Sequence, residues 1–171
     1  MPILSNPSAA ETAARFVEAM GAVATGVSVV TTVGESGKFG LTVSAISSVS
    51  AEPPMLLACL NRKSPAVAAI DQNRRFAVNI LGSDSKDIAQ IFSGRPTDGK
   101  AYDFDRHQWA EGPALKMPLL MMAASSFECE VEGVTDAGTH RIFVGRVLSA
   151  LRNHADPLIY CNRSFGRMTR I

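Results

Sequence analysis

A dense group of uncharged hydroxyl side chains stands out in the sequence. Its members fall within residues 42–50 and are Thr42, Ser44, Ser47, Ser48 and Ser50. Hydroxyls and backbone amides bind phosphate oxygens by directed hydrogen bonds, and a nearby cation such as Lys63 can add charge. Two interpretations stay open at this point. The segment is either a site for a flat cofactor that carries phosphate, or a strand whose outer face is rich in Ser and Thr.

The pair Ser64-Pro65 marks the start of a helix close to this group. Proline suits the first helical position, where its missing N–H costs nothing. The free amides and the dipole at such a start also favour a bound anion. Ser64 is therefore either a simple helix cap or a cap that also contacts phosphate.

The cysteines and histidines argue against a metal centre. The three cysteines are Cys59, Cys129 and Cys161. They are odd in number, widely spaced and set in apolar runs without a CxxC pair, which predicts buried, reduced thiols. The histidines, His107, His140 and His154, show no metal-ligand spacing with them. Taken alone, His140 is typical of a solvated turn residue.

Length and composition favour one globular domain over residues 1–171. Hydrophobic residues make up 46% of the chain and charged residues 19%, without a break in composition. The net charge is +1 and no basic block occurs, which argues against a large nucleic-acid interface. We find no apolar run of the roughly 20 residues that a membrane helix needs, and no signal peptide. We therefore expect a cytoplasmic protein without a membrane partner.

The first half of the chain alternates helix and strand signals. Ser8 and Glu11 match a capping box, and apolar residues follow at helical spacing, which predicts a helix over about 9–21. Runs rich in β-branched residues, separated by turn signals, predict strands. The expected strands span residues 27–33, 39–50, 55–61 and 76–81. Short helices are expected from Pro65 to about Asp71 and from Asp84 to Gly94, the second with Ile88, Ile91 and Phe92 buried.

The second half reads almost entirely as strand. Residues 95–114 are polar and irregular, as in a long surface excursion. Within 124–134, Phe127 and Cys129 alternate with Glu128 and Glu130, which predicts one buried and one wetted face. Further strands are expected over residues 141–151, 158–161 and 165–168. Many antiparallel strands with a few short helices favour a mainly β fold, a β-barrel over about 26–169.

The chain resembles the flavin reductase family that supplies reduced flavin to two-component monooxygenases, such as the reductase component of 4-hydroxyphenylacetate 3-monooxygenase. The matching segments occur in family order across about residues 10–168. They are residues 24–32, 40–45, 47–50, 53–57 and 76–81, His140 with 142–145, and 157–160. The resemblance implies a split β-barrel flavin-binding fold, a homodimer, and reduction of FMN or FAD by NADH or NADPH.

The resemblance also implies a flavin site. Its residues would be Thr42, Val43, Ser44, Ala45, Ser47, Cys59, Leu60, Asn61, Lys63, Ser64 and Phe92. Residues 42–45 would run beside the isoalloxazine and ribityl chain, and residues 59–61 with Lys63 and Ser64 would line the opposite edge and hold the phosphate end. Phe92 would close over the flavin or its adenine tail.

By the same resemblance, His140 would contact the nicotinamide and act as the catalytic residue. The family usually shows Gly-Asp-His before the strand that here begins at Arg141, whereas this chain has Gly138-Thr139-His140, so the aspartate is absent. The closing strand near the nicotinamide would contribute Tyr160, Arg163, Phe165 and Gly166. Arg163 is a candidate for the dinucleotide phosphates. Without the resemblance, these residues are typical of ordinary strand packing with one surface cation.

Such a site needs no acid–base pair, nucleophile or metal, since hydride passes from nicotinamide C4 to flavin N5 and the cofactors hold the reactivity. The protein has to stack two rings and orient them. The expected partner is a flavin-dependent monooxygenase. The alternatives are a reductase of a cobalt corrinoid acceptor in cobalamin biosynthesis and a flavin-binding dimeric module without turnover. Residues 119–122 offer apolar surface for a dimer contact.

Overall fold

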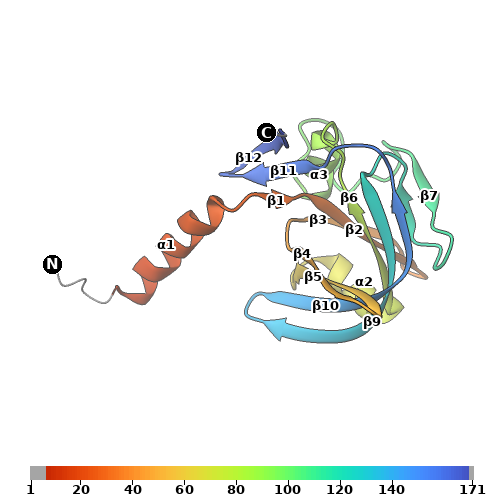
Figure 1. Cartoon of the computed structure of the whole chain (residues 1–171), viewed down its shortest axis with the longest axis horizontal. Coiled ribbons are helices and arrows are strands. Elements are labelled where there is room, and N and C mark those ends of the chain that lie inside the picture. The colour runs from red at the N-terminus through yellow and green to blue at the C-terminus, as the bar shows by residue number, and fades with distance from the viewer. Residues whose placement is uncertain (1–6, 170–171) are drawn as a thin grey trace.

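Seven antiparallel strands form one long, curled sheet, and a helix projects from its side (Figure 1). The computed structural model describes residues 7–169, so the two ends of the predicted domain lie outside the described range. The strand order in the sheet is β3-β2-β6-β9-β10-β5-β4. The bounds are β2 (Ser28–Gly34), β3 (Gly37–Val43), β4 (Ile46–Ala51), β5 (Pro54–Asn61), β6 (Arg75–Ile80), β9 (Ser125–Ala137) and β10 (His140–Arg152).

The mainly β prediction is confirmed, but the sheet does not close into the expected barrel. β3 and β4 lie at its two ends, and no strand pairing joins them within residues 7–169. The prediction of a single strand over 39–50 is also wrong, because two strands, β3 and β4, occupy this range. The chain leaves the strand path at Ser44 and Ala45, so that β3 pairs with β2 and β4 pairs with β5. Near this break, the amide of Cys59 donates to the carbonyl of Ala45 at 2.9 Å.

Two small sheets complete the body. The first has the order β1-β11-β12 and consists of β1 (Thr25–Gly26), β11 (Leu158–Cys161) and β12 (Ser164–Arg167). Asn162 and Arg163, with φ of 47° and 60°, form the tight turn between β11 and β12, where two left-handed residues match the twist of a hairpin. The second pairs β7 (Trp109–Glu111) with β8 (Pro118–Leu120) inside the expected surface excursion and just after it.

Two helices pack against the long sheet. α2 (Pro65–Asn73) begins where expected, since Ser64 Oγ accepts from the amide of Ala66 at 3.3 Å and Pro65 stands at the first helical position. α3 (Lys86–Phe92) begins two residues after Asp84 and buries Ile88, Ile91 and Phe92, as predicted. Burial of these apolar faces contributes roughly 1.5–3 kcal/mol per large side chain to folding.

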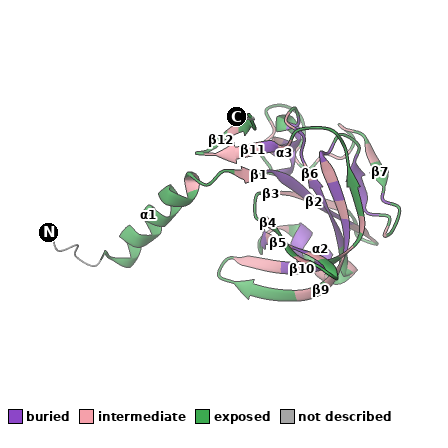
Figure 2. Cartoon of the chain, in the orientation of Figure 1, coloured by how far each residue is buried: buried purple, intermediate pink, exposed green. Residues whose placement is uncertain are grey.

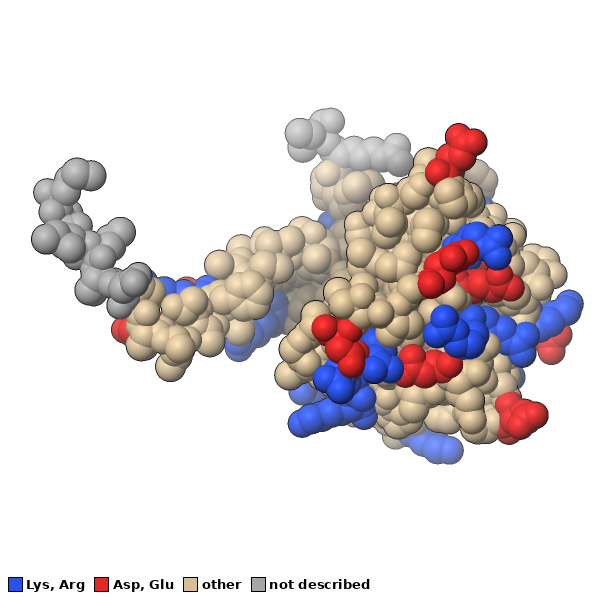
Figure 3. All heavy atoms as spheres, turned by 90° about the horizontal axis from the view of Figure 1, so that it is seen from below, with Lys and Arg blue, Asp and Glu red and all other residues tan. Residues whose placement is uncertain are grey.

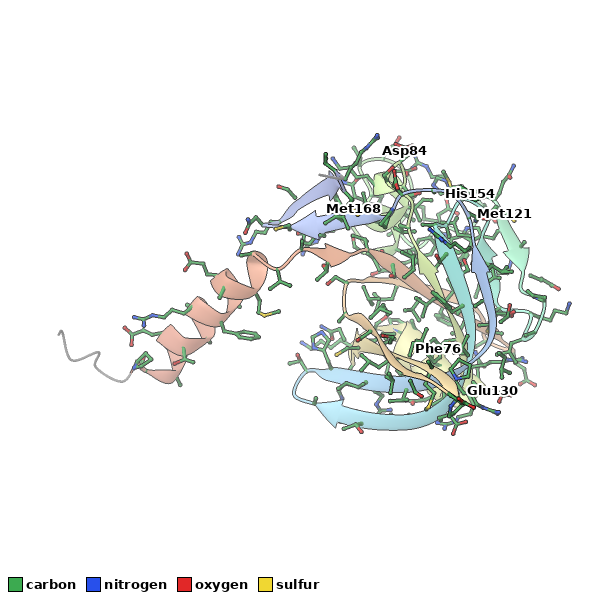
Figure 4. The ribbon with its side chains drawn as sticks, in the orientation of Figure 1. Phe76, Asp84, Met121, Glu130, His154 and Met168 are labelled. Carbon is green, nitrogen blue, oxygen red and sulfur yellow. The ribbon has the colours of Figure 1, made fainter. Side chains whose placement is uncertain are left out.

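The core lies inside the curl of the sheet. One cluster surrounds Phe76 and Phe143, whose ring centroids are 6.3 Å apart, and includes Ile70 of α2. A second cluster surrounds α3 and includes Phe92 and Leu120. Figure 2 shows burial along β2, β6 and α2, and the labelled Phe76 lies in the interior of the body in Figure 4.

α1 (Ala9–Gly21) carries the predicted capping box but has no buried residue. Its apolar stripe is open, with Phe16, Val17 and Met20 exposed at 63%, 56% and 49%. Figure 2 shows the helix exposed along its length, projecting away from the body. The sequence predicted the helix correctly, and the described chain leaves its apolar face uncovered.

The expected wetted face of β9 is wrong for the first half of the strand, whereas Glu130 and Glu132 are partly exposed. Glu128 and Ser126 are buried, because residues 112–117 fold over that face of the strand. The Glu128 carboxylate accepts from the amides of Ala114 and Leu115, both at 2.8 Å, and of Met117 at 3.2 Å. A buried carboxylate is stable in a protein only with such partners. Glu128 therefore anchors the covering loop.

The buried-thiol prediction is correct for one cysteine. Cys129 is fully buried, and burial raises the pKa of its thiol to about 12. Cys59 and Cys161 are half-buried. Burial also raises the pKa of the Cys59 thiol.

Candidate functional site

A cavity of about 450 Å³ opens between β3, α3 and the hairpin of β11 and β12. We call it the β3–α3 cavity. Its walls are Val27, Thr42, Val43, Ser44, Ala89, Gln90, Ser93, Arg95, Tyr160, Arg163 and Phe165. Small-molecule sites usually occupy about 300–1,000 Å³ and combine apolar walls with a few polar groups. The β3–α3 cavity has this size and composition.

β3 supplies both a fixed and a free hydroxyl to this cavity. Thr42 Oγ1 donates to the carbonyl of Ala89 at 2.8 Å, which ties β3 to α3. Ser44 lies two residues further on, where the strand has ended, and is exposed. Its hydroxyl has no protein partner within residues 7–169. Thr42 therefore holds the wall in place, whereas Ser44 keeps its hydrogen-bonding capacity for a ligand.

The opposite wall comes from the C-terminal hairpin. The rings of Tyr160 and Phe165 are register partners with centroids 5.2 Å apart and tilted by 60°. Arg163 stands at the turn, and Arg95 lines the cavity from beyond α3. Two guanidinium groups at the rim favour an anion, and Arg can bind phosphate in a bidentate manner.

Three of the five residues predicted for the nicotinamide side, Tyr160, Arg163 and Phe165, thus share a cavity with residues 42–44, whereas His140 lies outside it. Gly166 does not line this cavity either, because it lies beside Asp84 and Arg167 in a separate depression of about 290 Å³. Phe165 is the one residue that lines both this depression and the β3–α3 cavity. Asp84, labelled in Figure 4 at the top of the body, pairs there with Arg167.

A second group of predicted residues lies at the other end of the sheet, where β5 ends and β10 begins. His140 faces Asn61 in the strand register, and Thr139 Oγ1 lies 2.9 Å from His140 Nδ1. Asn61 Oδ1 accepts from the amide of Lys63 at 3.0 Å, which shapes the turn into Ser64. Asn61 and Lys63 are exposed, so their free donors can reach a ligand.

Other predicted flavin contacts are limited by burial or position. Leu60 is fully buried in the core, so only its backbone is available. Ala45 is exposed at the break between β3 and β4, and Cys59 is half-buried beside it. Ser47 is exposed on β4, and its hydroxyl donates to the carbonyl of Ser48 at 3.2 Å.

A charged network stands next to His140. Arg141 forms ion pairs with Asp71 and Asp136, and Arg62 lies 3.6 Å from Asp136. The hydrogen bond that Arg141 donates to Asp136 holds the pKa of Asp136 below its ordinary value. The same hydrogen bond raises the pKa of Arg141. Both carboxylates are thus engaged by arginine. On the face seen in Figure 3, basic and acidic side chains lie beside one another in the same way.

Phe92 does not reach a ligand as predicted. It is fully buried, with its ring centroid 4.9 Å from that of Phe104 and 5.5 Å from that of Trp109. Its ring also packs on the backbone of Gly40, where an added Cβ would come within 2.7 Å of it. The correction follows from helical geometry, because Phe92 shares the inward face of α3 with Ile88 and Ile91.

Sequence reasoning missed two sets of residues near these groups. Gln90 and Ser93 line the β3–α3 cavity from the polar face of α3, and their spacing of three residues could have identified that face. Tyr102 and Phe104 line a smaller cavity of about 240 Å³ between β3 and the start of α2. They are aromatic residues in an otherwise polar stretch, which is the signal that could have found them.

The described residues 7–169 contain no group of three or more His, Cys, Asp or Glu that could hold a metal ion. Within the same range, no helix combines the length and apolar character needed to cross a membrane.

Comparisons with known proteins point to one chemistry. A family model described as "Flavin reductase like domain" matches residues 20–169. The chain is 38% identical over 160 residues to an FMN reductase (NADH) RutF of Methylorubrum extorquens, covering 92% of this chain and 76% of the relative. It is 37% identical to the reductase component of a 4-nitrophenol 4-monooxygenase/4-nitrocatechol 2-monooxygenase of Rhodococcus opacus, covering 90% and 80%. Among solved structures, the flavin reductase component BorF of a bacterial two-component tryptophan halogenase superposes with a TM-score of 0.82 at 33% identity, covering 93% and 99%.

Proposed function

Because the chain belongs to the flavin reductase like domain family, we propose that it reduces FMN or FAD with NADH. One observation carries this proposal. The β3 residues expected beside a flavin and the hairpin residues expected beside a nicotinamide line the same cavity. The relatives named as NADH-dependent FMN reductase and as monooxygenase reductase component support the same chemistry.

The residues present fit a flavin. The cavity of about 450 Å³ has apolar walls, an unpartnered hydroxyl at Ser44, and the cations Arg95 and Arg163 at its rim. β3 pairs with β2 alone, so its other edge can offer backbone groups to a ring system. The hydroxyl and the backbone groups can bind the neutral tricyclic ring, and the two arginines can bind the anionic tail.

When bound, flavin would supply the acceptor for the hydride that NADH carries. The protein contributes position. Thr42 fixes β3 against α3, and Ser44 hydrogen-bonds and orients the ring system. Tyr160 and Phe165 cover the cavity from the hairpin side and exclude water, while Arg163 binds dinucleotide phosphate. Holding two reactants in register can supply roughly 7–11 kcal/mol of the barrier, so no acid–base residue is required.

His140, Asn61, Lys63 and Ser64 form the other edge of the proposed site. Lys63 and Ser64 stand at the start of α2, where exposed amides and positive charge suit a phosphate. Thr139 lies within hydrogen-bond distance of the Nδ1 atom of His140, which leaves Nε2 available for a ligand. His140 is a contact for NADH in this proposal.

A single assay tests the activity. Purified protein is mixed with NADH and either FMN or FAD, and absorbance is followed at about 340 nm. We expect NADH oxidation that depends on protein and on flavin. If the rate stays at the flavin-only background, the enzyme proposal fails and a flavin-binding module without turnover takes its place.

We propose that a flavin-dependent monooxygenase consumes the reduced flavin, because the relative from Rhodococcus opacus is the reductase component of a monooxygenase. A cobalt corrinoid in cobalamin biosynthesis is the alternative acceptor. Two coupled assays separate these acceptors. An aerobic assay with a purified oxygenase is read as oxygenated product, and an anaerobic assay with a cobalt corrinoid is read as the absorbance of the reduced corrinoid; only the true acceptor should give its product.

We also propose a homodimer in which a second copy covers α1. The open stripe of Phe16, Val17 and Met20 supports this, since an isolated helix of 13 residues is marginal in water. The predicted patch at residues 119–122 is half correct. Leu119 and Leu120 are buried, whereas Met121 and Met122 are exposed at 57% and 46%. Sedimentation that shows only an 18.2 kDa species would contradict the dimer.

We propose one domain and a cytoplasmic location. The long sheet draws its strands from most of the described chain, from β2 to β10, which supports a single domain. The cysteines are free, as is usual in a reducing compartment. Cell fractionation with antibody detection tests the location.

A further inference from the structure

We propose that the smaller cavity between β3 and the start of α2 is a subsite for adenine, the second ring system of an adenosine diphosphate ligand. We call it the α2 cavity. This inference rests on the proposed function and deepens it, because an adenine subsite favours FAD over FMN. Its walls are Lys38, Phe39, Gly40, Ser64, Pro65, Ala66, Tyr102 and Phe104.

The size of the α2 cavity suits one flat ring. Its volume is about 240 Å³, below the roughly 300 Å³ at which sites for drug-sized ligands begin. A tricyclic flavin with its side chain belongs in the larger β3–α3 cavity. What remains for the smaller one is a planar base that can lie against an aromatic wall.

Aromatic rings supply that wall. Tyr102 is half exposed, and Phe104 stands behind it with its own ring held by Phe92 and Trp109 at centroid distances of 4.9 and 5.0 Å. The packed rings keep Phe104 from collapsing into the cavity. Bases stack on such side chains because every base has a π face.

The backbone holds Tyr102 in place. Its φ is 58°, a left-handed conformation that is uncommon for a bulky residue. Its amide donates to the carbonyl of Ile91 at 3.1 Å, which ties it to the last turn of α3. Tyr102 thereby lines the α2 cavity while half of the residue stays exposed.

The α2 cavity lies next to the proposed phosphate end of the flavin. Ser64 belongs to both, since it caps α2 and lines the cavity. Lys63 precedes it, and Lys38 lines the opposite side, so a cation flanks the route on each side. An adenine attached through a pyrophosphate would enter the cavity directly beyond Ser64.

β3 connects the two cavities. Residues 38–40 line the α2 cavity, and residues 42–44 line the β3–α3 cavity. One residue, Leu41, separates them, so about 7 Å of strand lies between Gly40 and Thr42. A ligand with one ring system in each cavity would run along the unpaired edge of β3.

The adenine could belong to FAD or to NADH, and the test separates these sources. Tyr102→Gly removes the ring and suits the left-handed backbone, so the variant should fold. Tyr102→Phe is the matched control, because it keeps the ring. Fluorescence titrations measure the dissociation constants of FAD and FMN for each form, and steady-state assays with FMN measure the KM for NADH.

With FAD as the source, Tyr102→Gly raises the dissociation constant of FAD at least about fivefold, the effect of losing one stacked base, and that of FMN less than twofold. With NADH as the source, the same variant raises the KM for NADH and leaves both flavin constants unchanged. Tyr102→Phe changes none of them. Either pattern supports an adenine subsite.

Equal losses for FMN and FAD, or no change in any constant, overturn the inference. These results differ from a failure of the proposed function, in which the unaltered protein binds neither flavin or oxidises no NADH.

Discussion

Two groups of polar side chains differ in whether the protein itself satisfies them. Behind β6 and β9, Asn79 and Glu128 are fully buried, and each makes several hydrogen bonds. Asn79 Oδ1 accepts from the amide of Leu120 at 2.9 Å and from Ser126 Oγ at 3.0 Å. Around the two cavities, Ser44, Lys63 and Arg163 are exposed, and their side chains have no protein partner within residues 7–169.

This difference distinguishes polar side chains that stabilise the fold from polar side chains that are available to a ligand. A buried polar group costs free energy unless it is paired, so the Asn79 and Glu128 contacts serve folding. The exposed groups remain available because nothing in the described chain engages them. Substitutions in the first group should therefore change stability, and substitutions in the second should change binding.

Glu128→Ala is the strongest test of this contrast. It leaves three amides of the covering loop without an acceptor, and each unsatisfied buried group costs about 1–3 kcal/mol. We expect the free energy of unfolding to fall by about 3 kcal/mol or more in urea denaturation. Glu130→Ala is the control, since Glu130 forms only an exposed pair with Arg146 and such pairs contribute at most about 1 kcal/mol. Equal losses in the two variants would remove the distinction.

Combined replacement of Ser44 and Asn61 by Ala should weaken flavin binding about tenfold, because two hydrogen bonds of roughly 0.5–1.5 kcal/mol are lost. The free energy of unfolding should change by less than about 0.5 kcal/mol at Ser44, as is usual at the surface, and by at most about 1.5 kcal/mol at Asn61, which loses its hydrogen bond from the amide of Lys63. Fluorescence titration with FMN and urea denaturation measure the two quantities. Ser36→Ala, at an exposed turn, is the control. Unaltered affinity would refute the placement of both residues.

His140→Ala should raise the KM for NADH about fivefold, the effect of one hydrogen bond of about 1 kcal/mol, and leave flavin affinity unchanged. Steady-state kinetics with varied NADH provide the measurement. His154→Ala is the matched control, because His154 lies at the top of the body in Figure 4, far along the sheet from the β9–β10 hairpin. An effect of equal size in both variants would count against the role of His140.

Asp136 should give the smallest effect, present near neutral pH and lost in acid. Its pKa is held below the ordinary 3.8 by Arg141, so the pair stabilises the fold above that value. The contribution is lost as pH falls through the lower, folded-state pKa. We expect Asp136→Asn to have a slightly lower Tm than the unaltered protein at about pH 6 and the same Tm at about pH 2. A gap in Tm that persists at the lower pH would contradict this assignment.

Local signals predicted the elements well. The capping box set the start of α1, and Ser64-Pro65 set the start of α2. A β-branched run located β2, and an apolar run located β6. These features depend on neighbours in sequence, which a single chain displays directly. The family resemblance added residues 42–44 and the C-terminal hairpin, which line one cavity although more than a hundred residues separate them.

The errors came from contacts between distant segments. The alternation of β9 indicated a wetted face, but residues 112–117 cover it, and no pattern within β9 reveals a covering loop. The break at Ser44 and Ala45 was missed because strand-favouring residues stand on both sides of it, Leu41 to Val43 before it and Ile46 after it. Phe92 was assigned to the ligand because a position near a helix end does not reveal which neighbours, here Phe104 and Trp109, will enclose its ring.

The unpaired side of β3 has a consequence for handling the protein. β3 hydrogen-bonds to β2 along one side, and the other side opens onto both cavities. A bare strand edge is a template for another polypeptide, and natural proteins usually shield it. A bound flavin would be the shield here. Cells starved of riboflavin should therefore deposit this protein in inclusion bodies, and feeding the vitamin during expression should return it to the supernatant.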